Sequence, residues 1–145
     1  NSILPELRRQ GIELKVGKVP HCVLWSFPGA ISQIITNLVF NSINHAFTGI
    51  DNKQIALHSE IDPHSGALKL IYRDNGIGIP QKDQQAVFEP YFTTRREAGG
   101  SGLGLSIVKA LATNKLKGDL TFKSAPRKGV EFAFTLPLDI RQKKM

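Results

Sequence analysis

Hydrophobic and polar residues alternate along several short stretches of the chain, which predicts a β-sheet. Ile12, Leu14 and Val16 alternate with charged residues, the pattern of a half-buried edge strand. Further β-patterned runs occupy residues 54–61, 67–72, 119–123 and 130–136, and residues 23–25 add a short candidate strand. Turns that contain proline and glycine separate the runs 54–61 and 67–72 and the runs 119–123 and 130–136. Each of these two pairs is therefore predicted to form an antiparallel hairpin.

Apolar residues at helical spacing predict helices between these strands. The longest helix is expected at 28–47, opened by Pro28, with a core face formed by Ile31, Ile34, Ile35, Leu38 and Ile43. Shorter helices are expected at 81–87 and 103–115. The resulting order of strands and helices predicts a two-layer α/β sandwich, with a mixed, mainly antiparallel sheet and helices on one face.

The long helix carries a second, polar face of unusual composition. Asn37, Asn41 and Asn44 recur at i, i+4 and i+7, with His45 beside them. Asparagine is a poor residue inside a helix because its side chain competes for backbone hydrogen bonds. The stripe is therefore either a ligand-facing surface or a solvated face, and a solvated face more commonly carries Lys, Glu or Gln.

A carboxylate ends the predicted strand at 67–72. Asp74 is followed by Gly76 and Gly78, which allow the chain to turn sharply beside whatever the carboxylate faces. Such a carboxylate is placed to accept a hydrogen bond from an exocyclic amine such as adenine N6, or to cap the following turn.

A glycine-rich turn, residues 100–105, runs into the apolar pattern of the predicted helix at 103–115. Glycine backbone approaches a ligand closely, and the first free N–H groups of a helix attract anions, so this turn is a candidate phosphate cradle. A plain flexible loop is the other interpretation. A P-loop is excluded because Gly17-Lys18 is followed by Val19, and a dinucleotide fingerprint is excluded because Ile107 stands where its last glycine belongs.

The polar segment 93–100 leads into this turn and has few side chains to bury. It predicts a mobile lid, for which Phe88 and Phe92 serve either as anchors or as ordinary core residues.

Composition narrows the functional class. The 145 residues fit one compact domain; the single cysteine, Cys22, excludes an internal disulfide; and no apolar run approaches the ~18 residues of a membrane span. The formal charge of +7 suggests an anionic partner, but the basic residues are scattered, which argues against nucleic-acid binding. We therefore expect a cytoplasmic chain without membrane contact of its own.

Four motifs stand together in one order: Asn37-x-x-x-Asn41, Asp74-x-Gly76-x-Gly78, the segment 88–92 and Gly100-x-Gly102-x-Gly104. They resemble the N, G1, F and G2 boxes of the catalytic ATP-binding domain of bacterial sensor histidine kinases. That family belongs to a wider superfamily with gyrase, heat-shock chaperone and mismatch-repair ATPases, which share the Bergerat-type sandwich.

The resemblance implies ATP and Mg²⁺ as ligands. It makes Asn41 the Mg²⁺ ligand and Asp74 the acceptor for adenine N6, and it places Thr94 and Arg95 near the phosphates. The implied ATP-binding residues are Asn37, Asn41, Asn44, His45, Asp74, Gly76, Gly78, Ile79, Phe88, Thr93, Thr94, Arg95, Gly100, Ser101, Gly102, Leu103, Gly104, Leu105 and Val130.

Two positions depart from the family pattern. Many relatives carry Lys or Arg where Asn44 stands, and Arg95 or Arg96 is a candidate substitute. Relatives often have Thr near adenine where Val130 stands, and valine cannot donate that hydrogen bond.

The resemblance also implies that residues 11–140 are the catalytic domain, that 1–10 are the end of a connection from a dimerisation and phosphoacceptor domain, and that 141–145 are a basic tail. An acceptor histidine is followed by Asp or Glu in this family, and none of His21, His45, His58 and His64 is. No catalytic residue is therefore expected in this chain, whose partners would be the helical acceptor domain of the same, homodimeric protein and a response regulator. An inner-membrane anchor elsewhere in the parent is left open.

Two other functions remain as alternatives. One is an ATPase of the chaperone, gyrase or mismatch-repair type, and the other is a non-enzymatic nucleotide-sensing module. The hydrolases carry a water-activating Glu four residues before the magnesium Asn, whereas this chain has Asn37, which cannot accept a proton at neutral pH.

Overall fold

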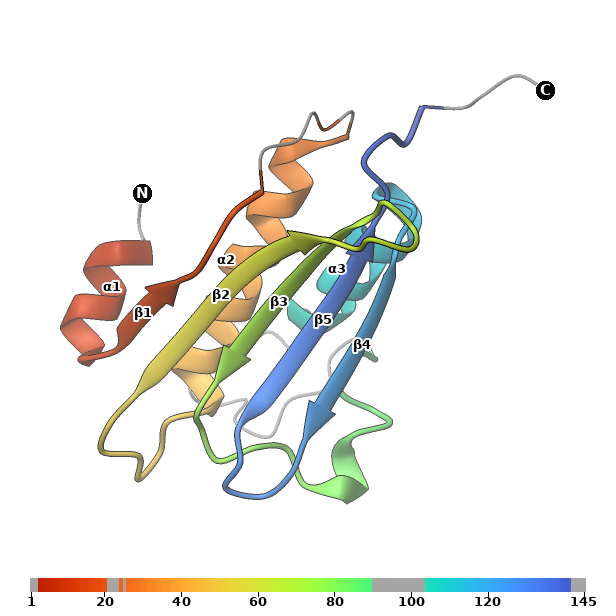
Figure 1. The fold of residues 1–145 in the computed structure, drawn as a ribbon. Helices are drawn as coiled ribbons and strands as arrows, with labels where there is room; N and C mark the ends of the chain where they lie inside the picture. Colours follow the sequence, from red (N-terminus) through yellow and green to blue (C-terminus); the bar gives the residue numbers. More distant parts are fainter. Residues whose placement is uncertain (1–2, 21–23, 25, 90–103, 142–145) are drawn as a thin grey trace.

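The computed structural model describes residues 3–20, 24, 26–89 and 104–141 and consists of two layers (Figure 1). A five-stranded sheet forms one layer, and the helices cover one of its faces. The main elements in chain order are α1 (Ile3–Gln10), β1 (Glu13–Val16), α2 (Pro28–His45), β2 (Gln54–Ile61), β3 (Leu68–Asp74), α3 (Gly104–Ala110), β4 (Asp119–Ser124) and β5 (Val130–Leu136).

The strand order is β1-β2-β3-β5-β4, with β1 parallel to β2 and every other pair antiparallel. This arrangement confirms the predicted mixed, mainly antiparallel sheet, its two hairpins and the edge position of β1. The register aligns Asp74 with Ile55 of β2 on one side and with Val130 of β5 on the other. Asp74, the last residue of β3, therefore lies on the central strand, at one end of the sheet.

The core lies between α2 and the inner face of the sheet. Alternate residues of β3 and β5, among them Tyr72, Phe132 and Phe134, are buried, as the period of two predicts. From the helical layer, Ile34 and Leu38 of α2 pack against them. The apolar face predicted from helical spacing thus faces the core, and it fixes which side of α2 lies next to the end of β3.

Two segments differ from the sequence-based expectation. Residues 3–10, expected as a connection, form the helix α1, because Ile3 and Leu7 lie one turn apart on a face that packs against the core and buries Leu7. The helix expected at 81–87 is a single 3₁₀ turn, Gln81–Asp83, followed by turns. The side chain of Gln84 there donates to the backbone oxygens of Ile79 and Ser124, which holds the segment to the neighbouring loop.

Several of the expected segments lie partly or wholly outside the described residues. The expected strand at 23–25 includes residues 23 and 25, which lie outside the described residues, as does the whole of the predicted lid at 93–100. The helix expected at 103–115 is described from Gly104, and after Ala110 it continues as a π-helical turn, Leu111–Lys115. The domain boundaries also remain predictions. None of the described helices is long and apolar enough to cross a membrane.

Replacing Ile34 with alanine tests the packing of α2. The side chain of Ile34 is 0% exposed, so Ile34→Ala removes buried methyl groups and leaves a cavity. We expect the free energy of unfolding to fall by about 2–5 kcal/mol in urea titrations. The neighbouring exposed residue gives the control: Gln33→Ala should change it by less than about 0.5 kcal/mol. Equal effects of the two substitutions would contradict this packing.

Candidate functional site

Asp74 is a buried carboxyl group at the end of the central strand β3, with 8% of its surface exposed. Its two oxygens are held by different elements. Ser42 Oγ of α2 donates to Oδ2 at 2.8 Å, and the backbone N–H of Gly76 donates to Oδ1 at 3.0 Å. The backbone N–H of Val130 also donates to this carboxyl group. The carboxyl group is thus fixed in orientation by a helix, a loop and a strand.

Burial dominates the electrostatics of this group. Removal from water disfavours the charged form and raises the pKa of Asp74 above its ordinary value of 3.8, while the bonds from Ser42, Gly76 and Val130 oppose that rise. A further donor would therefore be favourable at this site, because it would compensate the carboxylate for lost hydration.

The buried hydroxyl of Tyr72 is linked to the carboxyl group of Asp74 through Ser42. The hydroxyl of Tyr72 lies 2.6 Å from Ser42 Oγ and 3.1 Å from the backbone oxygen of Leu38. Burial raises the pKa of the Tyr72 phenol, which therefore stays a neutral hydroxyl.

Ser42 and Tyr72 belong to none of the sequence motifs, although the sequence contains a signal for each. Ser42 is a polar residue one turn after Leu38, on the apolar face of the helix. Tyr72 precedes Asp74 by two residues in a strand, which places both side chains on the same face of the sheet.

The loop after Asp74 is packed so tightly that glycine is required. A Cβ on Gly76 would lie 2.4 Å from the backbone oxygen of Ala46, and one on Gly78, whose φ is +77°, would lie 2.1 Å from the backbone oxygen of Ala125. A Cβ on Gly129, in the turn between β4 and β5, would lie 2.0 Å from the backbone oxygen of Asp74. These crowded positions bring the loop of Asp74 against both the end of α2 and the β4–β5 turn.

Hydrogen bonds hold the same loop to the β4–β5 turn. The backbone N–H of Ile79 donates to Ser124 Oγ at 2.8 Å, and that of Arg127 donates to the backbone oxygen of Ile77 at 2.7 Å. Ser124 Oγ donates in turn to the backbone oxygen of Gly129 at 2.9 Å. Among the predicted nucleotide-site residues, the structure brings together at this end of the sheet Asp74, Gly76, Gly78, Ile79 and Val130.

The asparagine stripe on α2 is divided between two environments. Asn37, Asn41 and His45 are half-buried, and Asn37 Nδ2 is a buried donor with no hydrogen-bond partner among the described residues. An acceptor atom of a ligand would satisfy this donor, so Asn37 fits a site that receives a polar group. No three or more His, Cys, Asp or Glu side chains gather as a metal site in the described parts of the chain.

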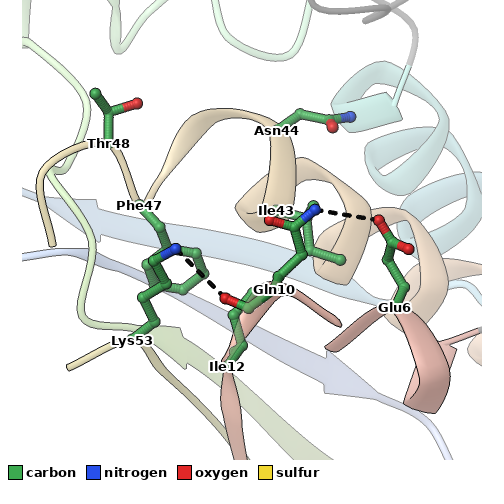
Figure 2. A pocket seen from close by; sticks show the side chains of 8 residues that line it. All are labelled: Glu6, Gln10, Ile12, Ile43, Asn44, Phe47, Thr48 and Lys53. Carbon is green, nitrogen blue, oxygen red and sulfur yellow. Dashed lines mark hydrogen bonds between the residues drawn. The ribbon is translucent and has the colours of Figure 1, made fainter. Parts of the chain in front are cut away.

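Asn44 instead lines a pocket of about 340 Å³ on the α1 side of α2 (Figure 2). Lys53 Nζ donates to the backbone oxygen of Gln10 and Gln10 Nε2 donates to Glu6 Oε1, both at 3.4 Å. Of the described residues predicted for the nucleotide site, Asn44 alone lines this pocket.

Phe88 belongs to an aromatic cluster on the sheet. Its ring meets Phe122 edge-on at 5.3 Å between centroids and Phe132 at 6.3 Å, and Lys109 Nζ lies 5.8 Å from its centroid. Phe88 therefore anchors the start of the segment that leads to the predicted lid.

The phosphate side of the predicted site is only partly described. Gly104 and Leu105 begin α3, with Leu105 buried in the core. The remaining candidates lie outside the described residues: Thr93, Thr94, Arg95, Gly100, Ser101, Gly102 and Leu103.

Comparison with known proteins places the chain in a family. Residues 28–140 match the model of the histidine kinase-, DNA gyrase B-, and HSP90-like ATPase family, and the chain belongs to that family. The family resemblance and the fold class predicted from the sequence are thereby confirmed, and so is the use of a nucleotide.

The relatives are sensor kinases. The autoinducer 2 sensor kinase/phosphatase LuxQ of Vibrio harveyi is 36% identical over 153 aligned positions, which cover 99% of this chain and 17% of LuxQ. The signal transduction histidine-protein kinase BarA of Escherichia coli K12 is 36% identical over 139 positions, which cover 90% of this chain and 15% of BarA. This chain thus spans less than a fifth of the length of either relative.

Solved structures of histidine kinases share the fold of this chain. The nucleotide-free catalytic domain of the histidine kinase ThkA superposes with a TM-score of 0.76 at 26% identity, over 93% of this chain and 84% of that one. The mycobacterial sensor histidine kinase MprB gives a TM-score of 0.72 at 28% identity, over 93% and 88%.

The raised pKa of Asp74 predicts a pH-dependent effect of Asp74→Asn on stability. Because the folded pKa exceeds the unfolded one, the contribution of Asp74 to stability is fully present below pH 3.8 and is lost as pH rises through the folded pKa. Asparagine does not ionise, so the free energy of unfolding of the variant should increase relative to that of the parent as pH rises from 3.8 through the folded pKa of Asp74. Above that pKa the difference between the two proteins should stay constant. Urea titrations of both proteins between pH 3 and pH 8 measure it.

The same substitution at Asp62 provides a control of opposite sign. The backbone N–H of His64 and the hydroxyl of Ser65 donate to Asp62 and lower its pKa, so its contribution is present above pH 3.8 and is lost as pH falls. Asp62→Asn should therefore lose stability relative to the parent as pH rises. Equal signs for the two variants would contradict the environment described for Asp74.

Proposed function

We propose that this chain is the ATP-binding catalytic domain of a sensor histidine kinase, in which Asp74 recognises the 6-amino group of adenine. The observation that carries the proposal is a buried carboxyl group, fixed by Ser42 and Gly76, at the end of the central strand of a nucleotide-using ATPase fold. The kinase activity of the whole protein is part of this proposal, because the chain covers 17% of LuxQ and 15% of BarA.

Asp74 suits an amine because its oxygens accept hydrogen bonds and an ionised carboxylate has none to donate. Of the four lone-pair positions of the carboxylate, three accept bonds from Ser42, Gly76 and Val130, which leaves one for a ligand. An amine hydrogen bonded there would compensate the buried charge, whereas the carbonyl oxygen of guanine would meet a second acceptor. Val130 beside it supplies packing and a backbone N–H but no side-chain donor, so base discrimination rests on Asp74.

The proposed metal ligand comes from α2, and the proposed phosphate contacts come from α2, residues 93–95 and the turn 100–105. Asn41 supplies an amide oxygen of the kind that Mg²⁺ accepts. One turn earlier, Asn37 offers an amide nitrogen that has no hydrogen-bond partner within the part of the chain that the structure describes. Mg²⁺ would neutralise phosphate charge there. Thr93, Thr94, Arg95 and the turn 100–105 are the proposed phosphate contacts, as predicted from the sequence.

Phosphoryl transfer to a histidine is favoured over hydrolysis by what stands at position 37. A hydrolase of this family needs a carboxylate there to activate water, and the asparagine amide cannot take up a proton at neutral pH. We propose that the acceptor is a histidine of a helical domain of the same homodimeric protein, that a response regulator receives the phosphoryl group, and that this domain works in the cytoplasm.

The first test compares nucleotides. Asp74→Asn should weaken ATP binding by about tenfold to a hundredfold and remove the preference for ATP over GTP, because an amide N–H₂ would face the amine of adenine. Calorimetric titrations of both nucleotides with Mg²⁺, on protein whose thermal melt shows it folded, measure the change. Asp62→Asn, in the exposed hairpin turn, is the matched control and should leave both affinities unchanged. Unaltered ATP binding by the Asp74 variant would overturn the base assignment.

The second test follows the γ-phosphoryl group. The chain alone should bind Mg·ATP with almost no release of phosphate, and label from γ-labelled ATP should appear on the helical domain of the parent protein when that domain is added. Sustained phosphate release that needs no partner and survives Asn37→Ala would favour the hydrolase alternative. Label on His21, His45, His58 or His64 would show that the acceptor lies in this chain.

A further inference from the structure

A chain of four oxygen atoms runs through the core from α2 to Asp74. It starts at the backbone oxygen of Leu38, passes through the hydroxyls of Tyr72 and Ser42, and ends on Asp74 Oδ2, with successive separations of 3.1, 2.6 and 2.8 Å. The Leu38, Tyr72 and Ser42 residues are each only 1% exposed, so water does not compete for these contacts.

Counting hydrogens fixes the direction of the bonds. The two hydroxyls supply two hydrogens for three contacts. When Asp74 is ionised it cannot donate, so the hydrogen of Ser42 must point to Oδ2. The hydrogen of Tyr72 is then shared between Ser42 Oγ at 2.6 Å and the backbone oxygen of Leu38 at 3.1 Å, since neither of these acceptors has a hydrogen left to donate. Ser42 therefore donates to the carboxylate, and Tyr72 donates both to Ser42 and to the backbone oxygen of Leu38.

The chain also limits how the carboxyl group can turn. Ser42 holds Oδ2 from the helix and the backbone of Gly76 holds Oδ1 from the loop, so rotation about the bond to Cγ would break both bonds. Without the hydroxyl of Ser42, Oδ2 would lose its only side-chain donor among the described residues. The carboxyl group would then be held only by the backbone N–H groups of Gly76 and Val130, and its orientation toward a ligand would be less restricted.

We propose that Ser42 and Tyr72 are positioning residues for adenine recognition: Ser42 holds Asp74 Oδ2 directly, and Tyr72 acts only through Ser42. The proposal rests on the proposed role of Asp74 and deepens it. Ser42 also follows Asn41 on the same helical turn, so the hydrogen-bonded chain fixes the position of that turn relative to the end of β3.

A pair of nucleotides separates positioning from simple structural support. ATP and purine riboside 5′-triphosphate differ only in the 6-amino group, so the ratio of their dissociation constants reports the bond to that amine. Ser42→Ala should weaken ATP binding about tenfold and leave the binding of the analogue unchanged. Tyr72→Phe keeps the aromatic ring and should weaken ATP binding relative to the analogue by only about twofold to threefold, a smaller effect than that of Ser42→Ala, since Ser42 still donates to Asp74.

The double variant tests the order of the residues. Because Tyr72 acts through Ser42, adding Tyr72→Phe to Ser42→Ala should change the ratio no further. Ser32→Ala, at an exposed position of the same helix, is the control and should leave the ratio at the parent value. Thermal melts accompany every variant, and if Ser42→Ala does not fold, the ratio measured for Tyr72→Phe decides.

The outcomes separate the role of Asp74 from the positioning role of Ser42 and Tyr72. A parent chain that binds ATP and the analogue equally well would overturn the role of Asp74, and the positioning role with it. A parent that prefers ATP, with variants that keep the full preference, would overturn only the positioning role. Equal loss of both nucleotides in Ser42→Ala or Tyr72→Phe would also overturn it, because this is the signature of structural damage.

Discussion

The buried carboxyl group of Asp74 is the constraint on which the rest of this site depends. A charge removed from water is costly, and the cost is tolerable only where donors are already in place. Here they come from Ser42 of α2, the backbone of Gly76 and the backbone of Val130. The side of α2 that faces the sheet, the turn after β3 and the register of β5 must therefore all be maintained together for the carboxyl group to remain buried.

The glycines around this group serve close packing of the protein itself. Each of Gly76, Gly78 and Gly129 lies where a Cβ would overlap a backbone oxygen of a neighbouring segment, at 2.0 to 2.4 Å. Ala46, Ala125 and Asp74 supply those oxygens, so the end of α2, the β4–β5 turn and the end of β3 converge on one loop. Close approach of these backbones makes the floor of the proposed base site rigid before any ligand arrives, which reduces the ordering that binding requires.

The departures from the family pattern have a common direction. Asn44 stands where many relatives carry a cation, and Val130 stands where relatives often carry a hydroxyl donor, so both positions are less charged or less polar than in the relatives that the motifs resemble. Asn44 lines the pocket with Glu6 and Lys53. In the proposed function, discrimination of the base therefore rests on Asp74 and on the two hydroxyls proposed to position it.

The sequence by itself determined the class of the fold and the position of the buried carboxyl group. These properties depend on local signals, which can be read without knowledge of the fold. Such signals are the alternation at Ile12, Leu14 and Val16, the turn residues within each hairpin, and the order of Asn41, Asp74 and the glycines along the chain. The helix α1 was not foreseen because its one buried residue, Leu7, is placed in the core only when α2 lies beside it.

Ser42 and Tyr72 were missed for a similar reason. They are 30 residues apart in sequence, and their hydroxyls form a bond only because β3 crosses beneath α2 at this place. Which neighbours a buried polar group meets was decided by the tertiary structure, since hydrogen bonds between elements depend on packing that no single segment encodes.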